Sequence, residues 1–229
     1  MRKIVFDTGP IISLALNNLL WLLEPLKKQS KAKFIITDAV KRELIDRPLN
    51  IKRFKFEALQ TMQYLRSKTI EVVSSSKTDN LTTELLELAN HCYKAKGEWI
   101  KILQYAEVQS LAYCLLENVD VMVVDERTTR LLIEDSEKLQ KILKHKLRTD
   151  VSANRDNIKR FHNKVKGIRM IRSVELVVMA YELGLLDKYM PDTDKPKRLL
   201  LDSVLWGLKL NGCSVSNREI EQIIKIEKA

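Results

Sequence analysis

Cysteine and histidine are scarce in this sequence. The 229 residues include three of each. Cys92, Cys114 and Cys213 are odd in number and widely spaced, which excludes a disulfide framework and a paired-cysteine zinc motif. His91 stands beside Cys92, but no second pair of ligands follows at zinc spacing, so we do not expect a zinc site. We expect the three cysteines to be small apolar residues on helices.

Long hydrophobic runs and nucleotide-binding loops are also missing. No apolar run reaches the roughly 20 residues that cross a bilayer. The first 15 residues, MRKIVFDTGPIISLA, loosely resemble a signal peptide, but Asp7 and Pro10 interrupt them and no small-residue cleavage site follows. We therefore interpret them as a buried strand and a turn, and expect a cytoplasmic protein without membrane contact. The absence of GxGxxG and Walker A sequences argues against a nucleotide-binding α/β enzyme.

The overall composition indicates a globular protein. Hydrophobic residues make up 45% of the chain and charged residues 31%, which is typical of a folded protein. The length suits one well-buried core with a helical annex. We expect a single domain over 1–229, with a basic insertion at 136–168 and a C-terminal helical part at 173–229.

The positive charge is concentrated in one segment. The net charge is +10, and Lys138–Arg172 contains 12 Lys and Arg against 2 Asp and Glu. The rest of the chain holds 28 of each sign. A local basic block is typical of a surface that binds a polyphosphate. The alternative is a solvated helix surface.

Apolar runs alternate with helical patterns along the chain. This alternation predicts an α/β domain with a parallel sheet. The expected strands are Lys3–Phe6, Lys33–Ile36, Ile70–Val73, Val121–Val124 and the shorter Gly167–Ile171. Helices are expected from Pro10, from Thr37 or Asp38 to Ile45, over Leu81–Tyr93, Trp99–Glu117, Glu126–Glu134, Ser173–Gly184 and Lys197–Gly212, and from Ser216, where Glu219 completes a capping box.

Four carboxylates occupy positions that suit a common site. Asp7 and Asp125 each close an apolar strand, and ligands of open parallel sheets bind at the carboxyl ends of the strands. Glu43 falls in the first turns of the helix after the second strand. Glu107 is expected mid-helix on an apolar face, where a carboxylate is costly unless a cation or hydrogen bonds compensate it.

Each acid also has an ordinary structural explanation. Asp7 and Asp125 could cap the helices that follow them, and Glu43 could lie on a helix surface. The combination of two strand-end aspartates with two helix glutamates in a basic protein favours a site. Oxygen-only ligands suit Mg²⁺ or Mn²⁺, and such ions assist phosphodiester cleavage.

At these residues the chain resembles the PIN-domain nucleases. IVFDTGPIISLA is similar to that family's first strand and first acid, FIITDAVKREL to its second strand and glutamate, YAEVQSLAYCL to the helix with its third acid, and VMVVDERTTRLL to its fourth strand and strand-end acid. MIRSVELVVMAYELGLL and LLLDSVLWGLKLNGCSVSNREIEQII resemble the C-terminal part of longer, mainly archaeal members. The resemblance covers most of the chain except about 46–98 and 136–168.

The resemblance implies a fold and an activity. The fold is a three-layer α/β/α sandwich around a five-stranded parallel sheet. The activity is metal-dependent endonucleolytic cleavage of RNA, with Asp7, Glu43, Glu107 and Asp125 as catalytic and metal-binding residues and Mg²⁺ or Mn²⁺ as the cofactor. Thr8, Arg130 and Ser173 would support the site. Tyr105–Ala106 replaces the family's Gly-Glu before the third acid, which is Glu107 where Asp is commoner.

The basic segment is expected to bind RNA next to this site. Lys141, Lys144, Lys159 and Arg160 are the predicted contacts, mainly to phosphate, because Phe161 is the segment's only aromatic residue. Two other functions remain open: a PIN-like RNA-binding or assembly protein without catalysis, and a toxin ribonuclease of a toxin–antitoxin pair. A homodimer, an antitoxin-like partner and an RNA-processing partner are likewise open.

Overall fold

Five short parallel strands form the centre of the protein in the computed structural model, which describes residues 2–74 and 76–228. The order across the sheet is β3-β2-β1-β6-β8, and every neighbouring pair is parallel. The bounds are Lys3–Phe6 for β1, Lys33–Thr37 for β2, Ile70–Val73 for β3, Val121–Val123 for β6 and Arg169–Ile171 for β8. The predicted α/β fold with a five-stranded parallel sheet is therefore confirmed.

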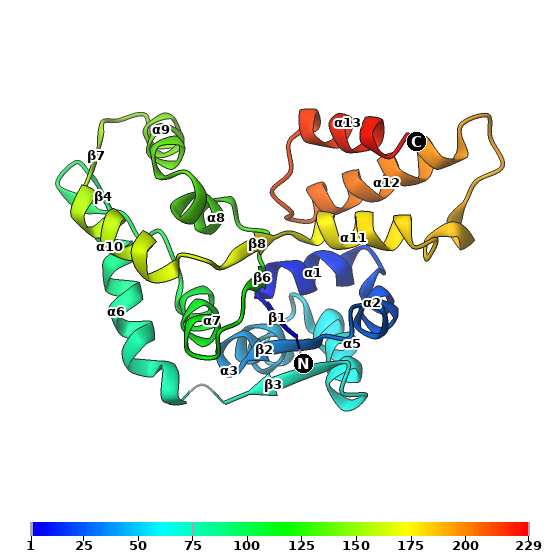
Figure 1. Cartoon of the computed structure of the whole chain (residues 1–229), viewed down its shortest axis with the longest axis horizontal. Coiled ribbons are helices and arrows are strands. Elements are labelled where there is room, and N and C mark those ends of the chain that lie inside the picture. Colours follow the sequence, from blue (N-terminus) through cyan, green and yellow to red (C-terminus); the bar gives the residue numbers. More distant parts are fainter. Residues whose placement is uncertain (1, 75, 229) are drawn as a thin grey trace.

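Side chains from the two faces of the sheet enter two separate cores. Ile4 and Phe6 point into one core and Val5 into the other, as the two-residue period of a strand requires. The first core also contains residues of α1 (Thr8–Leu16), α2 (Leu23–Ser30) and α11 (Ser173–Glu182). The second contains residues of α6 (Asp79–Asn90) and α7 (Tyr105–Leu116). Helices thus cover both faces, and the sheet forms the middle of three layers (Figure 1).

The helical segments near the N-terminus are short and pack against the first core. Leu14, Leu22 and Leu23 are buried against the first core. Among the described residues, no single helix has the length and hydropathy to cross a membrane, although Thr8–Leu16 and Leu20–Ser30 pass that test together as a pair bent by 118°.

The predicted basic insertion folds together with a second, smaller sheet. Its strand β7 (Val151–Ala153) pairs antiparallel with β4 (Tyr93–Ala95), which pairs with β5 (Glu98–Trp99). Helix α9 (Ser136–Leu147) packs on β7, and α8 (Arg127–Glu134) contacts both α9 and α10 (Arg155–Val165) (Figure 1). Phe161 is fully buried in the second core, so it is a packing residue.

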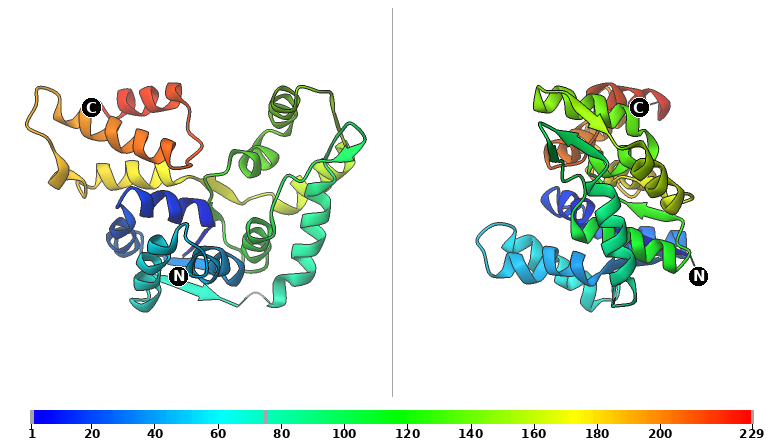
Figure 2. Two further views of the ribbon diagram at one scale, coloured as in Figure 1. Left: turned by 180° about the vertical axis from the view of Figure 1, so that it is seen from behind. Right: turned by 90° about the vertical axis from the view of Figure 1, so that its left-hand side faces the viewer.

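The C-terminal helices form a separate group above the main sheet. α12 (Pro196–Leu210) packs on α11 and α13 (Asn217–Ile226) packs on α12, and Figures 1 and 2 show both across from α8 and α9. The predicted capping box is confirmed, because Ser216 and Glu219 exchange hydrogen bonds at the start of α13. Arg172 joins this group to the end of β8 through Glu175 and Glu219.

Three helix predictions were wrong at their boundaries. α6 ends at Asn90 and Tyr93 lies in β4, while α7 begins only at Tyr105. The reason is the hairpin between β4 and β5, in which Lys96 and Gly97 both have positive φ. The helix predicted up to Ile45 changes to a wider π-helix, η2 (Arg42–Asp46). The remaining helical elements are η1 (Leu20–Leu22), α3 (Asp38–Lys41), α4 (Arg47–Leu49), α5 (Lys55–Arg66), η3 (Ser76–Thr78) and η4 (Asp187–Tyr189).

Candidate functional site

The connections of the main sheet diverge between β1 and β6. From central β1 the chain builds β2 and β3 on one side, and β6 and β8 on the other. Such a topological switch point leaves a crevice at the carboxyl ends of the strands. Asp7 directly follows β1, and its amide donates to the carbonyl of Val123 at the end of β6. Asp125 lies two residues after β6, so the two aspartates meet at this crevice.

All four predicted carboxylates line one cavity at this point. Its volume is about 550 Å³. It is lined by Asp7, Gly9, Glu43, Lys101, Ile102, Gln104, Glu107, Asp125, Glu126, Lys146 and Gly212. The residues come from the ends of β1 and β6, from the first turns of α1 and α7, from η2, from the loop before α7, from α9 and from the loop after α12. The fold therefore brings together acids separated by more than 100 residues in the chain.

Gly9 allows the first turn of α1 to approach Asp125. A Cβ atom at Gly9 would lie 3.5 Å from Cβ of Asp125 and 3.8 Å from Oδ2 of Asp7. A side chain larger than a methyl group would extend into the space between the two aspartates. The glycine thus keeps the floor of the cavity open.

Asp7 is the most perturbed of the four acids. It is 5% exposed. Its Oδ2 accepts from the Gly9 amide at 3.4 Å, while Oδ1 is buried without any hydrogen-bond partner among the described residues. Burial raises the pKa of Asp7 to about 8, and the nearby charges of Glu107 and Glu43 add to this increase. A buried carboxylate oxygen without a donor is a position that a cation would stabilise.

Glu107 lies in the first turn of α7, so its predicted mid-helix position was wrong. Because the helix begins at Tyr105, Glu107 can accept from the amide of Gln104 at 2.8 Å and complete a capping box. Its other oxygen accepts from the hydroxyl of Thr129 on α8. Burial raises the pKa of Glu107, and the charges of Glu126 and Glu43 act in the same direction.

Glu43 is placed by the π-helical turn η2. This turn widens the helix locally and often occurs at functional sites. Glu43 is half-buried, and its Oε2 accepts from the Thr8 hydroxyl at 2.7 Å. The bond connects the start of α1 to η2 across the cavity.

Asp125 is held by both donors of one serine. The Ser173 amide donates to Oδ1 at 2.8 Å and the Ser173 hydroxyl donates to Oδ2 at 2.7 Å. The backbone carbonyl of Asp125 accepts from the Ser214 amide at 3.2 Å. Asp125 is only 2% exposed, so these bonds fix the orientation of its carboxylate.

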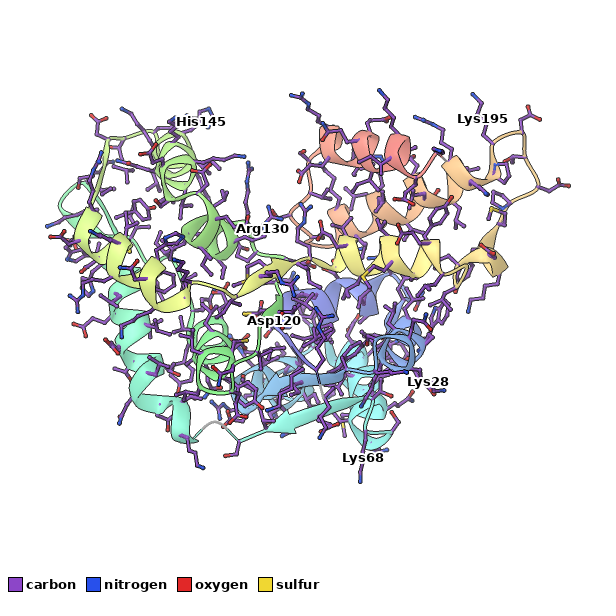
Figure 3. The ribbon with its side chains drawn as sticks, in the orientation of Figure 1. Lys28, Lys68, Asp120, Arg130, His145 and Lys195 are labelled. Atoms are coloured by element: carbon purple, nitrogen blue, oxygen red, sulfur yellow. The ribbon has the colours of Figure 1, made fainter. Side chains whose placement is uncertain are left out.

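Three of the four acids are thus oriented by a hydroxyl group. Thr8 and Ser173, predicted as supporting residues, hold Glu43 and Asp125. Thr129, which holds Glu107, was missed by the sequence reasoning, although it lies four residues after Asp125 in the same motif. Arg130, the third predicted supporting residue, lies on α8 outside the lining of the cavity (Figure 3). Its Nε lies 3.9 Å from Glu134 and is buried without a hydrogen bond.

The four carboxylates suit a divalent cation in the chemistry of their ligand atoms. The acids offer oxygen ligands, as Mg²⁺ and Mn²⁺ prefer, and Oδ1 of Asp7 has no other partner. Within residues 2–74 and 76–228, however, no group of three or more His, Cys, Asp or Glu side chains is arranged to hold a metal ion. Hydrogen bonds from hydroxyl groups hold the carboxylates of Glu43, Glu107 and Asp125. Binding of a metal ion would require these side chains to rearrange, and the metal site stays a prediction.

The predicted RNA-binding residues do not line the acidic cavity. Lys141 and Lys144 line a shallow hollow with His145 and Arg148, and Lys144 pairs with Asp150 at 2.6 Å. Lys159 lines another hollow between α9 and α10. Arg160 lines neither hollow, and all four stay predictions as RNA contacts. The two lysines that do line the acidic cavity, Lys101 and Lys146, were not singled out from the sequence.

The chain matches no protein-family model, no curated protein and no solved structure.

Proposed function

We propose that this protein is a divalent-metal-dependent endoribonuclease, a hydrolase similar to the PIN-domain nucleases. The observation that supports the proposal most strongly is the meeting of four carboxylates in one cavity at the switch point of a parallel sheet. Asp7, Glu43, Glu107 and Asp125 come from four separate elements, and their order along the chain is the one that the resemblance implies. The lysines at the same cavity would attract a polyanion that the acids alone would repel.

Asp7 and Asp125 would hold the ion, with Glu43 and Glu107 as direct or water-mediated ligands. A bound Mg²⁺ or Mn²⁺ would supply an activated water and neutralise charge on the phosphate. In the metal-free protein the raised pKa of Asp7 keeps a proton on its carboxyl group near neutral pH. That proton limits the repulsion among the acids.

The neighbouring hydroxyl groups would orient the reaction. Thr8, Thr129 and Ser173 hold one carboxylate each, and such fixed donors reduce the freedom of the acids before the substrate arrives. In the hydrolysis itself, a water oxygen bonds to phosphorus, one bridging P–O bond breaks, and the leaving oxygen takes up a proton. The buried floor around Asp7 and Asp125 would exclude bulk water during this step.

One observation favours a second candidate, a PIN-like RNA-binding or assembly protein without catalysis. In the part of the chain that the structure describes, no three acidic, histidine or cysteine side chains form a ready metal site. Such a protein would bind RNA through the basic surfaces and would need none of the carboxylates. Metal dependence of RNA cleavage separates the two candidates.

The test is cleavage of structured and single-stranded RNAs in Mn²⁺, Mg²⁺ and EDTA. We expect cleavage in either ion and none in EDTA. Asp125→Asn and Glu107→Gln should reduce the rate by orders of magnitude while RNA binding survives, because each amide keeps the shape but removes the charge.

The matched control is Asp120→Asn. Asp120 precedes β6, at the opposite end of the strand from Asp125, and is exposed with Arg169 as its partner at 2.6 Å. It lies outside the cavity, so cleavage should remain at the wild-type rate. Undiminished cleavage by the Asp125 and Glu107 variants would place the activity elsewhere or in a contaminant. Metal-independent RNA binding with no cleavage would support the second candidate.

A further inference from the structure

Two lysines from separate elements face the acidic cavity. Lys101 lies in the loop between β5 and α7, and Lys146 lies in the last turn of α9. Both line the cavity that contains the four acids and Glu126. Both side chains are exposed, so their ammonium groups are accessible to a ligand that enters from solvent.

Neither lysine is neutralised by the acids beside it. Some other lysines of the protein do form salt bridges, as Lys3 does with Glu117, Lys41 with Asp46 and Lys144 with Asp150. For Lys101 and Lys146 the described residues provide no ion pair and no side-chain hydrogen bond. Lys144 is only two residues before Lys146 on the same helix, but it faces the separate hollow around Arg148.

The acids of this cavity have partners other than the two lysines. A lysine gains a modest but favourable Coulomb energy when it pairs with a carboxylate. Here the carboxylates are turned toward Thr8, Thr129 and Ser173 instead. The lysines and the acids line the same cavity of about 550 Å³, and a cavity of this volume can admit a ligand between them.

We propose that Lys101 and Lys146 bind two phosphates of the substrate strand, on either side of the phosphate that reaches the acids. Because each lysine touches the substrate away from the reacting atoms, it is a positioning residue. This inference rests on the proposed function for the identity of the polyanion, RNA. It adds two residues to the site, and it places the path of the strand over the acidic cavity and past the last turn of α9.

The first measurement is binding of a fluorescently labelled RNA oligonucleotide in EDTA, as a function of salt. We expect Lys101→Ala and Lys146→Ala each to weaken binding. The slope of log affinity against log salt should fall by about 0.7 for each lost single-strand phosphate contact, and by about twice that in the double variant. Lys→Arg variants should retain binding, because the charge is kept. Lys195→Ala, at the distant tip between α11 and α12 (Figure 3), is the matched control and should change nothing.

Removing a negative charge from the cavity tests whether the RNA passes through it. Glu126→Gln removes a negative charge from the same cavity, and its amide oxygen can still accept from Thr128 as the carboxylate does. If RNA passes this cavity, Glu126→Gln should strengthen binding in EDTA while the lysine variants weaken it. A folded double lysine variant with the wild-type salt slope would overturn the inference.

The second measurement separates this inference from the proposed function. In Mn²⁺, the lysine variants should raise KM for RNA and leave kcat nearly unchanged. A lowered kcat at unchanged KM would overturn the positioning role. If the wild type binds RNA with the expected lysine dependence but does not cleave it, the inference stands and the proposed function fails. If the wild type binds no RNA, both fail.

Discussion

Among the four acids, Asp7 has the carboxyl group whose pKa is most clearly changed by its surroundings. It is buried, one of its oxygens has no hydrogen-bond partner among the described residues, and two other carboxylates lie near enough to raise its pKa. A carboxyl group in this state is either protonated or stabilised by a cation. The protein therefore has two ways to stabilise Asp7, and pH distinguishes them when no metal is present.

In EDTA, the stability of the protein should fall as the pH rises from about 4 to about 8. The pKa of Asp7 is raised from 3.8 to about 8 by folding, so the folded state binds a proton that the unfolded state has already lost. This contribution is complete below pH 4 and is lost as the pH rises through 8. Asp7→Asn should flatten the profile and be more stable than the wild type at pH 9, by a few kcal/mol at about 1.4 kcal/mol per pKa unit. Urea unfolding at pH 5, 7 and 9 measures this difference.

The control for this prediction is Asp120→Asn. The pKa of Asp120 is lowered by its hydrogen bond from Arg169, so its removal should not flatten the profile. Parallel pH profiles for the wild type and Asp7→Asn would contradict the assignment of the buried proton to Asp7.

Site residues could be predicted from the sequence where they directly follow a strand. Asp7 and Asp125 each follow a short apolar run, and the ends of parallel strands meet on one edge of the sheet. Lys101 and Lys146 carry no such signal in the sequence. Their place at the cavity depends on how the loop before α7 and the helix α9 pack beside the main sheet. Thr129 could be found only once α7 and α8 were known to be adjacent.

At the scale of elements, Arg172 links the end of β8 to the C-terminal helices. Its side chain is 8% exposed and bonds to Glu175, to Glu219 and to the carbonyl of Ser214. The amide of the same Ser214 donates to the carbonyl of Asp125. Burial tends to raise the pKa of Glu219, but hydrogen bonds from Ser216 and Arg172 outweigh burial and lower it to about 2.

Replacing Arg172 should loosen α13 and the loop before it. We expect Arg172→Leu to destabilise the protein by roughly 1.5–3 kcal/mol, as for the loss of a hydrogen bond to a charged group. Amide hydrogen exchange should accelerate in Asn217–Ile226 more than in α7. Arg198→Leu is the matched control, since its exposed pair with Glu221 at 3.1 Å should contribute less than about 1 kcal/mol. Equal effects of the two substitutions would show that the buried link is unimportant.

Element types were easier to predict than element boundaries. β1 and β3 have the predicted bounds because their apolar runs are flanked by polar or turn residues. The hairpin at Lys96–Gly97 was missed, since its two strands are very short and β4 gains its second partner from β7, more than 50 residues later. The π-helical turn with Glu43 carries no pattern of its own, because it depends on packing rather than on local propensity.

At the scale of the whole molecule, a basic segment lies beside an acidic centre. The segment Lys138–Arg172 contains the whole positive excess of the chain, and its helices α9 and α10 stand on one side of the crevice (Figure 1). Reversing the charges of Lys141, Lys144, Lys159 and Arg160 should weaken RNA binding with little sequence dependence. The salt slope should fall by up to about 0.7 per lost contact.

The control for the charge reversal uses cations of the C-terminal helical group. Reversal of Lys195, Lys197, Arg218 and Lys225 changes the net charge equally but leaves the basic segment intact. Metal-induced stabilisation should be nearly the same in both variants and in the wild type. Equal loss of the salt slope in the two variants would show that only net charge matters, and an unaltered slope in the first would place the RNA path elsewhere.

The most direct test of the account is thermal unfolding of the wild type and of Asp7→Asn in Mn²⁺ and in EDTA. At 100 times the dissociation constant, an ion that binds only the folded state stabilises it by about 2.7 kcal/mol, which corresponds to a rise in Tm of roughly 5–10 °C for a chain of this size. We predict such a rise for the wild type and a much smaller rise for Asp7→Asn, because the substitution removes the buried charge that would hold the ion. Identical shifts in the two proteins, or no shift in either, would contradict a metal site at this cavity.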